Sequence, residues 1–369
     1  MTLKTHALIN LDNLVYNVHC IRNLVAPSGL IPVIKADAYG HGAVAVAKRL
    51  IAEGEGIFAV AQLQEGLELR ESGIDRPILI LGRLFPEEIP QAVKAGFVMT
   101  VFGREDVSWI ERTGLAVPAS VHVKVETGMG RQGLHFCDAP GAFESLAKSG
   151  ACRWEGLYSH FSTSDEKDKT YSKLQLSRFG EFLSLARRFE NGPRMIHMAA
   201  SGAILDIPES RFDAVRPGIV MYGHYPSLET SRPFVPRQVM TLKTVVAHLR
   251  EMPEGHPISY GRRWVAPGAT RIAVLPIGYA DGLNRRLTNA GEVLIQGRRY
   301  PMVGTVTMDY TMVDVGADPV EVGDEVVLWG ESPQGAIQAW EVAEKLGTIP
   351  YELTCAVSRR VKRVYIGAE

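Results

Sequence analysis

Residues 30–42 read LIPVIKADAYGHG, a short run rich in Ile and Val that ends at a lysine and passes into a Tyr-Gly-His-Gly turn. An apolar run bounded by turn residues favours a buried strand. Before it, apolar residues recur at helical spacing over residues 14–25, behind Asn10 and Asp12, either of which can cap a helix start. Because Pro27 stops this pattern, the segment predicts a helix followed by a strand.

The same alternation of short apolar runs and segments of helical period continues to residue 223. It indicates repeated βα units and a parallel sheet. Eight runs are expected to be strands: LIPVIKA from Leu30, IFAVA from Ile57, ILILG from Ile78, FVMTVF from Phe97, SVHVKVE from Ser120, EGLYSH from Glu155, MIHMAA from Met195 and AVRPGIVMYG from Ala214. Eight such strands approach the size of a (β/α)8 TIM barrel, and a doubly wound open sheet of eight strands is the alternative.

The texture of the sequence changes after Tyr222, where three prolines punctuate PSLETSRPFVPRQ. Beyond them, runs such as RIAVLPI and EVVLW are separated by Gly and Pro, which predicts a mainly β domain with one short helix near residues 337–346. We therefore expect an α/β protein with a barrel over residues 1–232 and a C-terminal, mainly β domain over residues 233–369.

Composition excludes several classes of protein. With 369 residues, of which 46% are hydrophobic and 22% charged, the chain can bury a substantial core, which excludes disordered and fibrous proteins. Forty basic and 41 acidic side chains leave a net charge of −1, so we expect a small-molecule partner rather than nucleic acid or an anionic membrane. The four cysteines form no CxxC pair, which argues against a zinc site or a disulfide framework and fits reduced thiols in the cytoplasm. Neither an export signal nor a membrane span is visible, and no metal is expected.

Lys35 lies at the end of the first predicted strand. Barrel enzymes carry their reactive groups at this end of their strands, and a partly desolvated lysine there can form an imine with a carbonyl cofactor. The alternative is an ordinary lysine whose amine reaches solvent at a strand end.

Segments spread over most of the chain resemble the alanine racemase family, in the family's order. They are VIKADAYGHG (33–42), KVETGMGRQG (124–133), SHFSTSDE (159–166), HMAASG (197–202), RPGIVMYG (216–223), ISYG (258–261), PIGYADG (276–282) and PYELTCAVSRRV (350–361). The resemblance implies a barrel followed by a β domain, one pyridoxal 5′-phosphate per subunit and a homodimer. It also implies interconversion of L- and D-alanine, which would supply D-alanine for peptidoglycan.

The resemblance further implies roles for individual residues. Lys35 carries the cofactor and is one catalytic base, and Tyr260, reaching across the dimer interface, is the second. The implied cofactor ligands are Tyr39, His160, Ser201, Arg216, Gly218, Ile219 and Tyr351, in addition to Lys35. Arg131 and Met308 are implied to bind the substrate carboxylate, and Tyr279 and Tyr351 to narrow the entrance. His197 is implied to lie behind Arg216, and Lys124 to orient Arg131, with carbamylation as in some relatives.

The resemblance also implies that Arg216 meets the pyridine nitrogen of the cofactor. Because a guanidinium donates a hydrogen bond without giving up its proton, Arg216 would leave this nitrogen neutral. The residues alone leave other interpretations open. Arg216 could pair with Asp213 or Asp206 in a purely structural role. Ser201 could be a helix cap and Tyr260 a packing residue.

Gly128, Gly130 and Gly133 spell GxGxxG, the pattern of a dinucleotide site. That pattern has to open a helix, whereas LHFCDAP intervenes here and the next helix is expected near residues 138–140, which argues against such a site.

Four residues depart from common family forms: Ala200, Asp37, Thr305 and Thr307. They put phosphate affinity and strict preference for alanine in question, so a broader racemase that also accepts serine is an alternative. A barrel-type decarboxylase is a second rival, but its glycine-rich phosphate segment and reactive cysteine block are not found. A non-catalytic pyridoxal-phosphate carrier should lack the β domain and Tyr260.

Overall fold

The structure is a computed structural model that describes residues 4–114 and 116–367. The described chain divides into two compact units. One, the barrel unit, comprises residues 14–38 and 43–237 apart from residue 115. The other, the β unit, comprises residues 4–13, 39–42 and 238–367.

The barrel unit is built on eight parallel strands in the order β2-β9-β8-β7-β6-β5-β4-β3. The strands are β2 (Gly29–Leu30), β3 (Phe58–Val60), β4 (Ile78–Ile80), β5 (Val98–Val101), β6 (Ala119–Lys124), β7 (Cys152–Tyr158), β8 (Met195–Ala200) and β9 (Ala214–Arg216). Each of the eight predicted runs therefore overlaps one strand of the same sheet, although the runs from Leu30 and Ala214 are strands only at Leu30 and over Ala214–Arg216. Their residues are almost all buried, as expected for a parallel sheet that is covered on both faces.

The residues that follow β2 close the sheet into a barrel. The amides of Ile31 and Val33 donate to the carbonyls of Val215 and Pro217 on one side, at 2.8 and 2.9 Å. On the other side Val33 pairs in parallel with Ala59, and the Ile34 amide donates to the Ala59 carbonyl at 2.9 Å. This extended segment continues β2 and bonds to β9 on one side and to β3, at the far end of the order, on the other, so the structure favours the barrel over an open doubly wound sheet.

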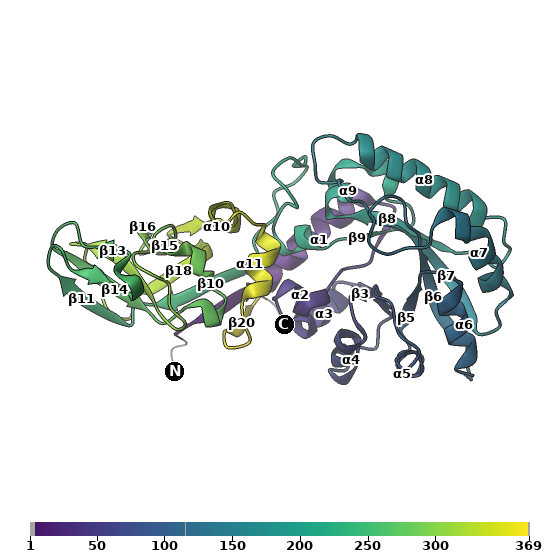
Figure 1. Ribbon diagram of the computed structural model, residues 1–369, viewed down its shortest axis with the longest axis horizontal. Helices are drawn as coiled ribbons and strands as arrows, with labels where there is room; N and C mark the ends of the chain where they lie inside the picture. Colours follow the sequence, from purple (N-terminus) through teal and green to yellow (C-terminus); the bar gives the residue numbers. More distant parts are fainter. Residues whose placement is uncertain (1–3, 115, 368–369) are drawn as a thin grey trace. The chain divides into compact units, whose positions relative to one another are not determined.

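Helices lie on the outside of these strands (Figure 1). They are α1 (Leu11–Val25), α3 (Ala43–Ala52), α4 (Leu63–Glu71), α5 (Ile89–Lys94), α6 (Arg104–Arg112), α7 (Ala139–Lys148), α8 (Thr170–Ala186) and α9 (Ser201–Asp206). The helix predicted over residues 14–25 is α1, and Asn10 caps it, because its Oδ1 accepts the Asn13 amide at 3.0 Å. The predicted start near residues 138–140 is also confirmed, by α7.

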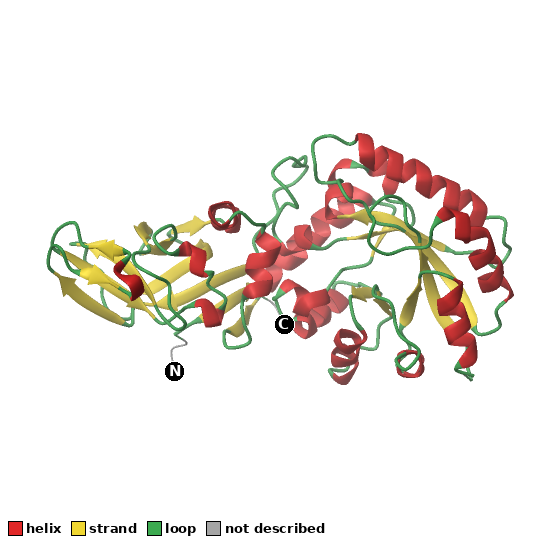
Figure 2. Ribbon diagram, in the orientation of Figure 1, coloured by secondary structure: helices red, strands yellow, loops and turns green. Residues whose placement is uncertain are grey.

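The β unit consists mainly of strands (Figure 2). Its largest sheet has the order β16-β15-β18-β10-β1-β20, with β19 beside β18, and β11-β14-β17 and β12-β13 form smaller sheets. The strands are β1 (His6–Asn10), β10 (Met240–Val245), β11 (His248–Met252), β12 (Pro257–Ile258), β13 (Trp264–Val265), β14 (Thr270–Leu275), β15 (Glu292–Ile295), β16 (Arg298–Pro301), β17 (Thr311–Gly316), β18 (Glu325–Ser332), β19 (Gly335–Ile337) and β20 (Lys362–Ile366). Two helices, α10 (Ala339–Leu346) and α11 (Pro350–Ala356), complete it, and α10 is the helix predicted near residues 337–346.

The contacts assign residues 4–13 to the β unit, whereas the expected division had included them in the barrel. The strand β1 belongs to the β unit, because it pairs antiparallel with β10 and parallel with β20. Ala7 and Ile9 on this strand are fully buried. A strand of five residues carries no sign of which sheet it will join, so sequence order alone assigned it to the barrel.

Candidate active site

Lys35 begins an unusual turn, labelled α2 (Lys35–Tyr39), at the carboxyl end of the extended segment that closes the barrel. Ala36, Asp37 and Ala38 have φ of 52, 53 and 54°, so the backbone winds left-handed without a glycine. Each such residue costs about 1–2 kcal/mol, and the surroundings must hold the turn in place. The Ala38 amide donates to the Ile34 carbonyl at 2.9 Å.

Two carboxylates stabilise this turn from the neighbouring elements. Glu65 accepts the Ala36 amide at 2.6 Å through one oxygen and the amides of Ala61 and Gln62 at 2.7 and 3.0 Å through the other. Asp37 accepts the amide of Ala43, the first residue of α3, at 2.7 Å. The lysine is therefore anchored to the start of α4 and α3. Sequence reasoning missed Glu65, although its spacing from Gln62 is that of a capping box.

Arg216 ends β9 and is buried, with 3% of its surface exposed. Its Nη1 donates to His197 Nδ1 at 2.6 Å, and its Nη2 donates to the Ser159 carbonyl at 2.7 Å and lies 3.3 Å from His160 Nδ1. Burial lowers the pKa of this guanidinium to about 10, so it stays charged near neutrality.

Neither acid that could have given Arg216 a structural role pairs with it. Asp213 accepts the Ile196 amide at 2.7 Å, and Asp206 forms an ion pair with Lys169 at 2.8 Å. The partners of Arg216 within the described residues are imidazole nitrogens and backbone carbonyls, all neutral. A buried cation without an anion suits an uncharged acceptor, such as the nitrogen of a pyridine ring.

Aromatic rings surround this cation. Tyr158 stacks on His197 with 4.7 Å between ring centroids, and the Arg216 guanidinium lies 5.0 Å from the Tyr158 ring. Burial, and secondarily the charge of Arg216, lowers the pKa of both His197 and His160 well below the usual value, so both imidazoles are neutral. Tyr158 was missed in the sequence, where it reads as one more apolar residue of β7.

Lys124 ends β6 and is buried. Burial, followed by the charges of Arg131 and Arg216, lowers the pKa of its amine to about 8. Lys35 contributes to the same lowering, so the two lysines and two arginines belong to one electropositive region of the barrel unit. Such a region attracts an anion, or an amine that also carries a carboxylate group.

Arg131 lies on an exposed turn that is organised by Glu126. The Glu126 carboxylate accepts four successive backbone amides, those of residues 128, 129, 130 and 131, the last two at 3.0 and 3.4 Å. The amides of the GxGxxG segment therefore already surround an internal anion, and α7 begins only at Ala139. Both facts exclude the dinucleotide site. Glu126 was also missed, and its place two residues before a glycine-rich turn was the available signal.

Ser201 follows β8 and is the first residue of α9. Its hydroxyl accepts the amides of Gly218 and Val220 at 3.1 and 3.4 Å, so it faces the turn after β9 rather than capping its own helix. Gly218 and Ile219 are in this same turn, and the loops after strands seven and eight of a barrel are where phosphate is commonly bound. Ala200, which precedes the helix, has no polar side-chain group that could bind a phosphate.

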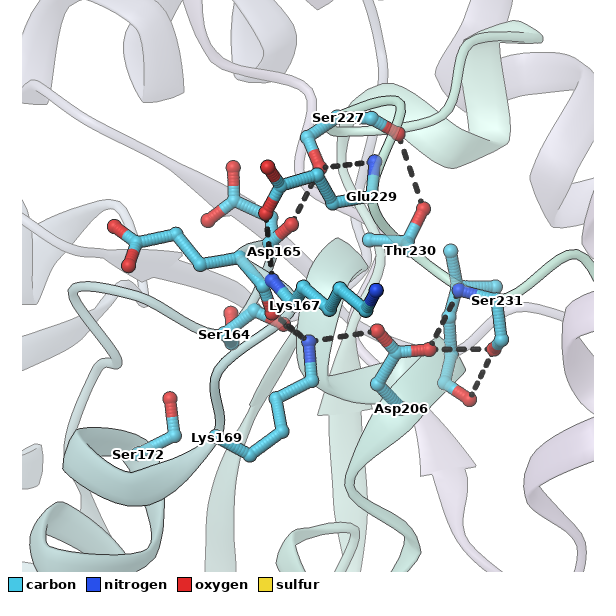
Figure 3. Close-up of polar contacts among 12 residues, drawn as sticks. Ser164, Asp165, Lys167, Lys169, Ser172, Asp206, Ser227, Glu229, Thr230 and Ser231 are labelled. Atoms are coloured by element: carbon cyan, nitrogen blue, oxygen red, sulfur yellow. Dashed lines mark hydrogen bonds and ion pairs between the residues drawn. The ribbon is translucent and has the colours of Figure 1, made fainter.

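A polar network fixes the loop between β7 and α8 beside α9 (Figure 3). Lys169 pairs with Asp206 at the end of α9 and donates to the carbonyl of Ser164 at 2.9 Å. Asp206 also accepts the amide of Ser231 at 2.9 Å. A Cβ added to Gly202 would lie 2.8 Å from Ser164 Oγ, so the loop packs directly on the first turn of α9. The network thereby holds the helix that carries Ser201.

The other predicted site residues belong to the β unit. Tyr39 and Tyr351 face each other with ring centroids 6.0 Å apart. Tyr260 is 75% exposed, the highest fraction among the large exposed hydrophobic residues that the structure describes, and it opens a 3₁₀ turn between residues of positive φ, Ser259 and Gly261. A packing role for Tyr260 within this chain is therefore not supported.

One segment, residues 305–310, links Tyr260 to the expected entrance. Thr305 Oγ1 donates to the Tyr260 carbonyl at 2.7 Å. The carbonyls of Thr307 and Met308 accept the amides of residues 279 and 280 at 3.0 and 3.1 Å, so Met308 lies beside Tyr279. Thr305 and Thr307, two of the departures from the family pattern, thus position the segment that carries Met308.

The predicted site residues fall into two groups. Lys35, Lys124, Arg131, His160, His197, Ser201, Arg216, Gly218 and Ile219 belong to the barrel unit, and Tyr39, Tyr260, Tyr279, Met308 and Tyr351 to the β unit. Over residues 4–114 and 116–367 no group of three or more His, Cys, Asp or Glu side chains could hold a metal ion. No helix in that part of the chain is long and apolar enough to cross a membrane.

Comparison with known proteins shows the family of this chain. Residues 9–226 match the family described as "Alanine racemase, N-terminal domain" and residues 239–365 the family described as "Alanine racemase, C-terminal domain". The chain is 43% identical over 370 residues to alanine racemase 2 of Caldanaerobacter subterraneus, covering 98% of this chain and 95% of the relative. It is 43% identical over 362 residues to the alanine racemase of Carboxydothermus hydrogenoformans, covering 97% and 98% of the two chains.

Solved structures give the same result. An alanine racemase of Clostridium difficile superposes with a TM-score of 0.94 at 39% identity, covering 99% of this chain and 96% of that one. One from Bacillus anthracis, with bound L-Ala-P, superposes with a TM-score of 0.93 at 38% identity, covering 100% and 96%. These relatives do not favour a decarboxylase or a non-catalytic carrier.

Proposed function

This chain belongs to the alanine racemase family of isomerases, and we propose how its own residues interconvert L-alanine and D-alanine. The proposal rests above all on Arg216, a buried charged guanidinium with only neutral partners among the described residues. Such a group is costly to fold and would be retained where it faces an acceptor supplied by a bound molecule. The family indicates pyridoxal 5′-phosphate as that molecule, and the residues present fit it.

When bound, pyridoxal phosphate supplies an aldehyde for the amine and an electron-withdrawing ring that makes the substrate Cα proton acidic. Lys35 would hold the aldehyde carbon, and Arg216 would donate to the ring nitrogen without protonating it. Ser201, the amides of Gly218 and Ile219, and the Tyr39 and Tyr351 hydroxyls would receive the phosphate. His160 would lie beside the ring. A pyridine ring with a neutral nitrogen withdraws less electron density from Cα, which favours return of the proton over transamination.

Racemisation requires one proton acceptor on each face of Cα. The Lys35 amine would remove or return the proton on one face. Tyr260 is our candidate for the other face, and its phenol would exchange a proton with Cα from a neighbouring copy of the chain. The 75% exposure of this aromatic ring supports the interface, because Tyr is enriched where proteins associate. We therefore propose a homodimer in which each Tyr260 serves the other subunit.

Arg131 and the Met308 amide would bind the substrate carboxylate, and the Tyr279 and Tyr351 side chains would narrow the entrance around a methyl side chain. The exposure of Tyr279 and Met308, 43% and 51%, is consistent with contact to a bound molecule. We also propose a cytoplasmic location and a role in supplying D-alanine for peptidoglycan. The four free cysteines fit a reducing compartment.

Lys124 is our candidate for carbamylation. With a pKa of about 8, roughly one amine in ten is neutral at pH 7, which makes the nitrogen available to attack carbon dioxide. The new N–C bond releases one proton and leaves a carbamate anion, which the nearby charges of Arg131 and Arg216 would stabilise. Protein labelled with 13C-bicarbonate should show a carbamate resonance that disappears in Lys124→Met. A resonance that persists in this variant contradicts the assignment.

Two experiments test the function as a whole. Incubation of the holoenzyme with L-alanine in deuterated water should give D-alanine with deuterium at Cα, whereas release of carbon dioxide would indicate a decarboxylase. L-serine in the same assay measures how strict the preference for alanine is. Hydride reduction followed by peptide mapping should then place the pyridoxyl group on Lys35, and labelling of another lysine refutes the site.

A further inference from the structure

A buried histidine of β6, His122, lies behind the pair of Arg216 and His197. His122 Nδ1 is 2.9 Å from His197 Nε2, and both imidazoles are buried. The neighbouring strand makes room for this ring with a glycine, because a Cβ on Gly156 would lie 2.5 Å from His122 Nδ1. Arg216, His197 and His122 therefore form a continuous hydrogen-bonded row across three strands of the barrel unit.

The direction of each hydrogen bond in this row follows from the donors. A guanidinium has no acceptor, so His197 Nδ1 must accept from Arg216. Burial and the charge of Arg216 lower the pKa of His122 to about 3 and that of His197 well below its usual value, so both rings are neutral. A neutral His197 then carries its proton on Nε2 and donates it to His122 Nδ1. Each ring has one possible tautomer.

We propose that His122 is a positioning residue for the racemisation, acting on Arg216 through His197. With partners on both nitrogens, the His197 ring is fixed in plane, and its Nδ1 is held at 2.6 Å from Arg216 Nη1. Without His122, the buried Nε2–H of His197 has no acceptor, and the ring gains by turning toward one. Arg216 would then lose a hydrogen-bond partner, and with it the orientation in which it would donate to the pyridine nitrogen of the cofactor. This inference rests on the proposed function of Arg216.

His122 also extends the row to the opposite side of the barrel from the strand ends that carry Lys35 and Arg216. It lines a cavity of about 870 Å³ together with residues near the amino ends of the strands, among them Ile57, Pro77 and Met195. We therefore expect His122 to affect the reaction through its hydrogen bond to His197 rather than through contact with substrate.

The test compares two variants of the full-length, cofactor-loaded protein. His122→Leu removes the acceptor, whereas His122→Asn keeps an oxygen near the position of Nδ1. We expect His122→Leu to lower kcat about 10-fold with KM within about twofold, to shift the absorption maximum of the bound cofactor and to raise the yield of pyridoxamine phosphate. His122→Asn should restore all three. His224→Leu is the matched control, since His224 is also a buried histidine of this unit, with a pKa lowered to about 4 by burial.

A measurement on the unmodified protein gives a readout that needs no activity. In holoenzyme labelled with 15N-histidine, a coupling across the hydrogen bond should join His197 Nε2 to His122 Nδ1. Its absence overturns the inference, as does a His122→Leu protein that binds cofactor with unchanged spectrum and kcat. If His122→Leu does not fold, the coupling and the His122→Asn spectrum still decide. An Arg216→Gln variant with an unchanged cofactor spectrum would instead contradict the proposed function itself.

Discussion

Glu126→Gln is the substitution for which the structure gives the most definite expectation. The carboxylate accepts four backbone amides with two oxygens, two amides to each. A glutamine keeps one oxygen and turns an NH2 toward the other pair, so two charge-assisted hydrogen bonds are lost. At the lower end of the usual range, because this group is partly exposed, they contribute about 2–3 kcal/mol in all. We expect the turn that carries Arg131 to be less stable by this free energy.

The assay measures kcat/KM for L-alanine together with the urea midpoint. Since 1.4 kcal/mol corresponds to tenfold, a loss of about 2 kcal/mol at the substrate carboxylate lowers kcat/KM about 30-fold. Glu144→Gln is the control, because Glu144 is exposed and forms a surface ion pair with Lys148, and we expect kcat/KM and the urea midpoint to stay near their wild-type values there. Wild-type values of both kcat/KM and urea midpoint in Glu126→Gln would refute the reasoning.

The same residue predicts a pH dependence. Partial burial alone raises the pKa of Glu126, but its four backbone hydrogen bonds together bring it below the usual 4.5. A carboxylate with a lowered folded-state pKa contributes stability that is present above pH 4.5 and lost as the pH falls through the folded-state pKa. The difference in unfolding free energy between wild type and Glu126→Gln should therefore shrink below pH 4.5.

Three further predictions follow from the described contacts. Thr305→Val removes the hydroxyl that donates to the Tyr260 carbonyl, and kcat should fall about 3- to 10-fold with little change in cofactor affinity, measured by racemisation and by fluorescence titration. Lys169→Met leaves a partly buried carboxylate unpaired beside α9, and cofactor affinity should weaken about 10-fold in the same titration, while Lys173→Met should not change it. A maleimide at pH 7 should label the exposed Cys137 but not Cys152, whose pKa burial raises to about 11, and fast labelling of Cys152 would show that this strand opens.

Much of the barrel could be predicted because its strands are short, apolar and regularly separated by amphipathic helices. Periodicity reports burial, and in a parallel sheet nearly every strand residue is buried. The sheet that a strand joins is a matter of tertiary contact. Residues 6–10 form an ordinary short strand, and only their pairing with residues 240–245 and 362–366 places them in the β unit.

The sequence indicates candidate site residues where a side chain lies at a strand end or beside a glycine turn, as Lys35 and Arg131 do. It does not indicate the supporting residues. His122 and Tyr158 lie within strands, where their polar atoms look like exceptions to an apolar pattern, and their role depends on neighbours in other strands. Glu65 and Glu126 act on backbone amides, which the sequence does not reveal. Local patterns indicate reactive groups, and packing determines what orients them.

The placement of β1 has a consequence for biosynthesis. This strand lies between β10 and β20, so residues 6–10 complete a sheet with residues 240–245 and 362–366, which the ribosome adds much later. Until those residues are made, both edges of β1 lack their native partners and are open to pairing with other strands. A gene fragment encoding only residues 238–369 should yield an aggregating product, whereas co-expression with a peptide spanning residues 4–13 should recover the missing strand.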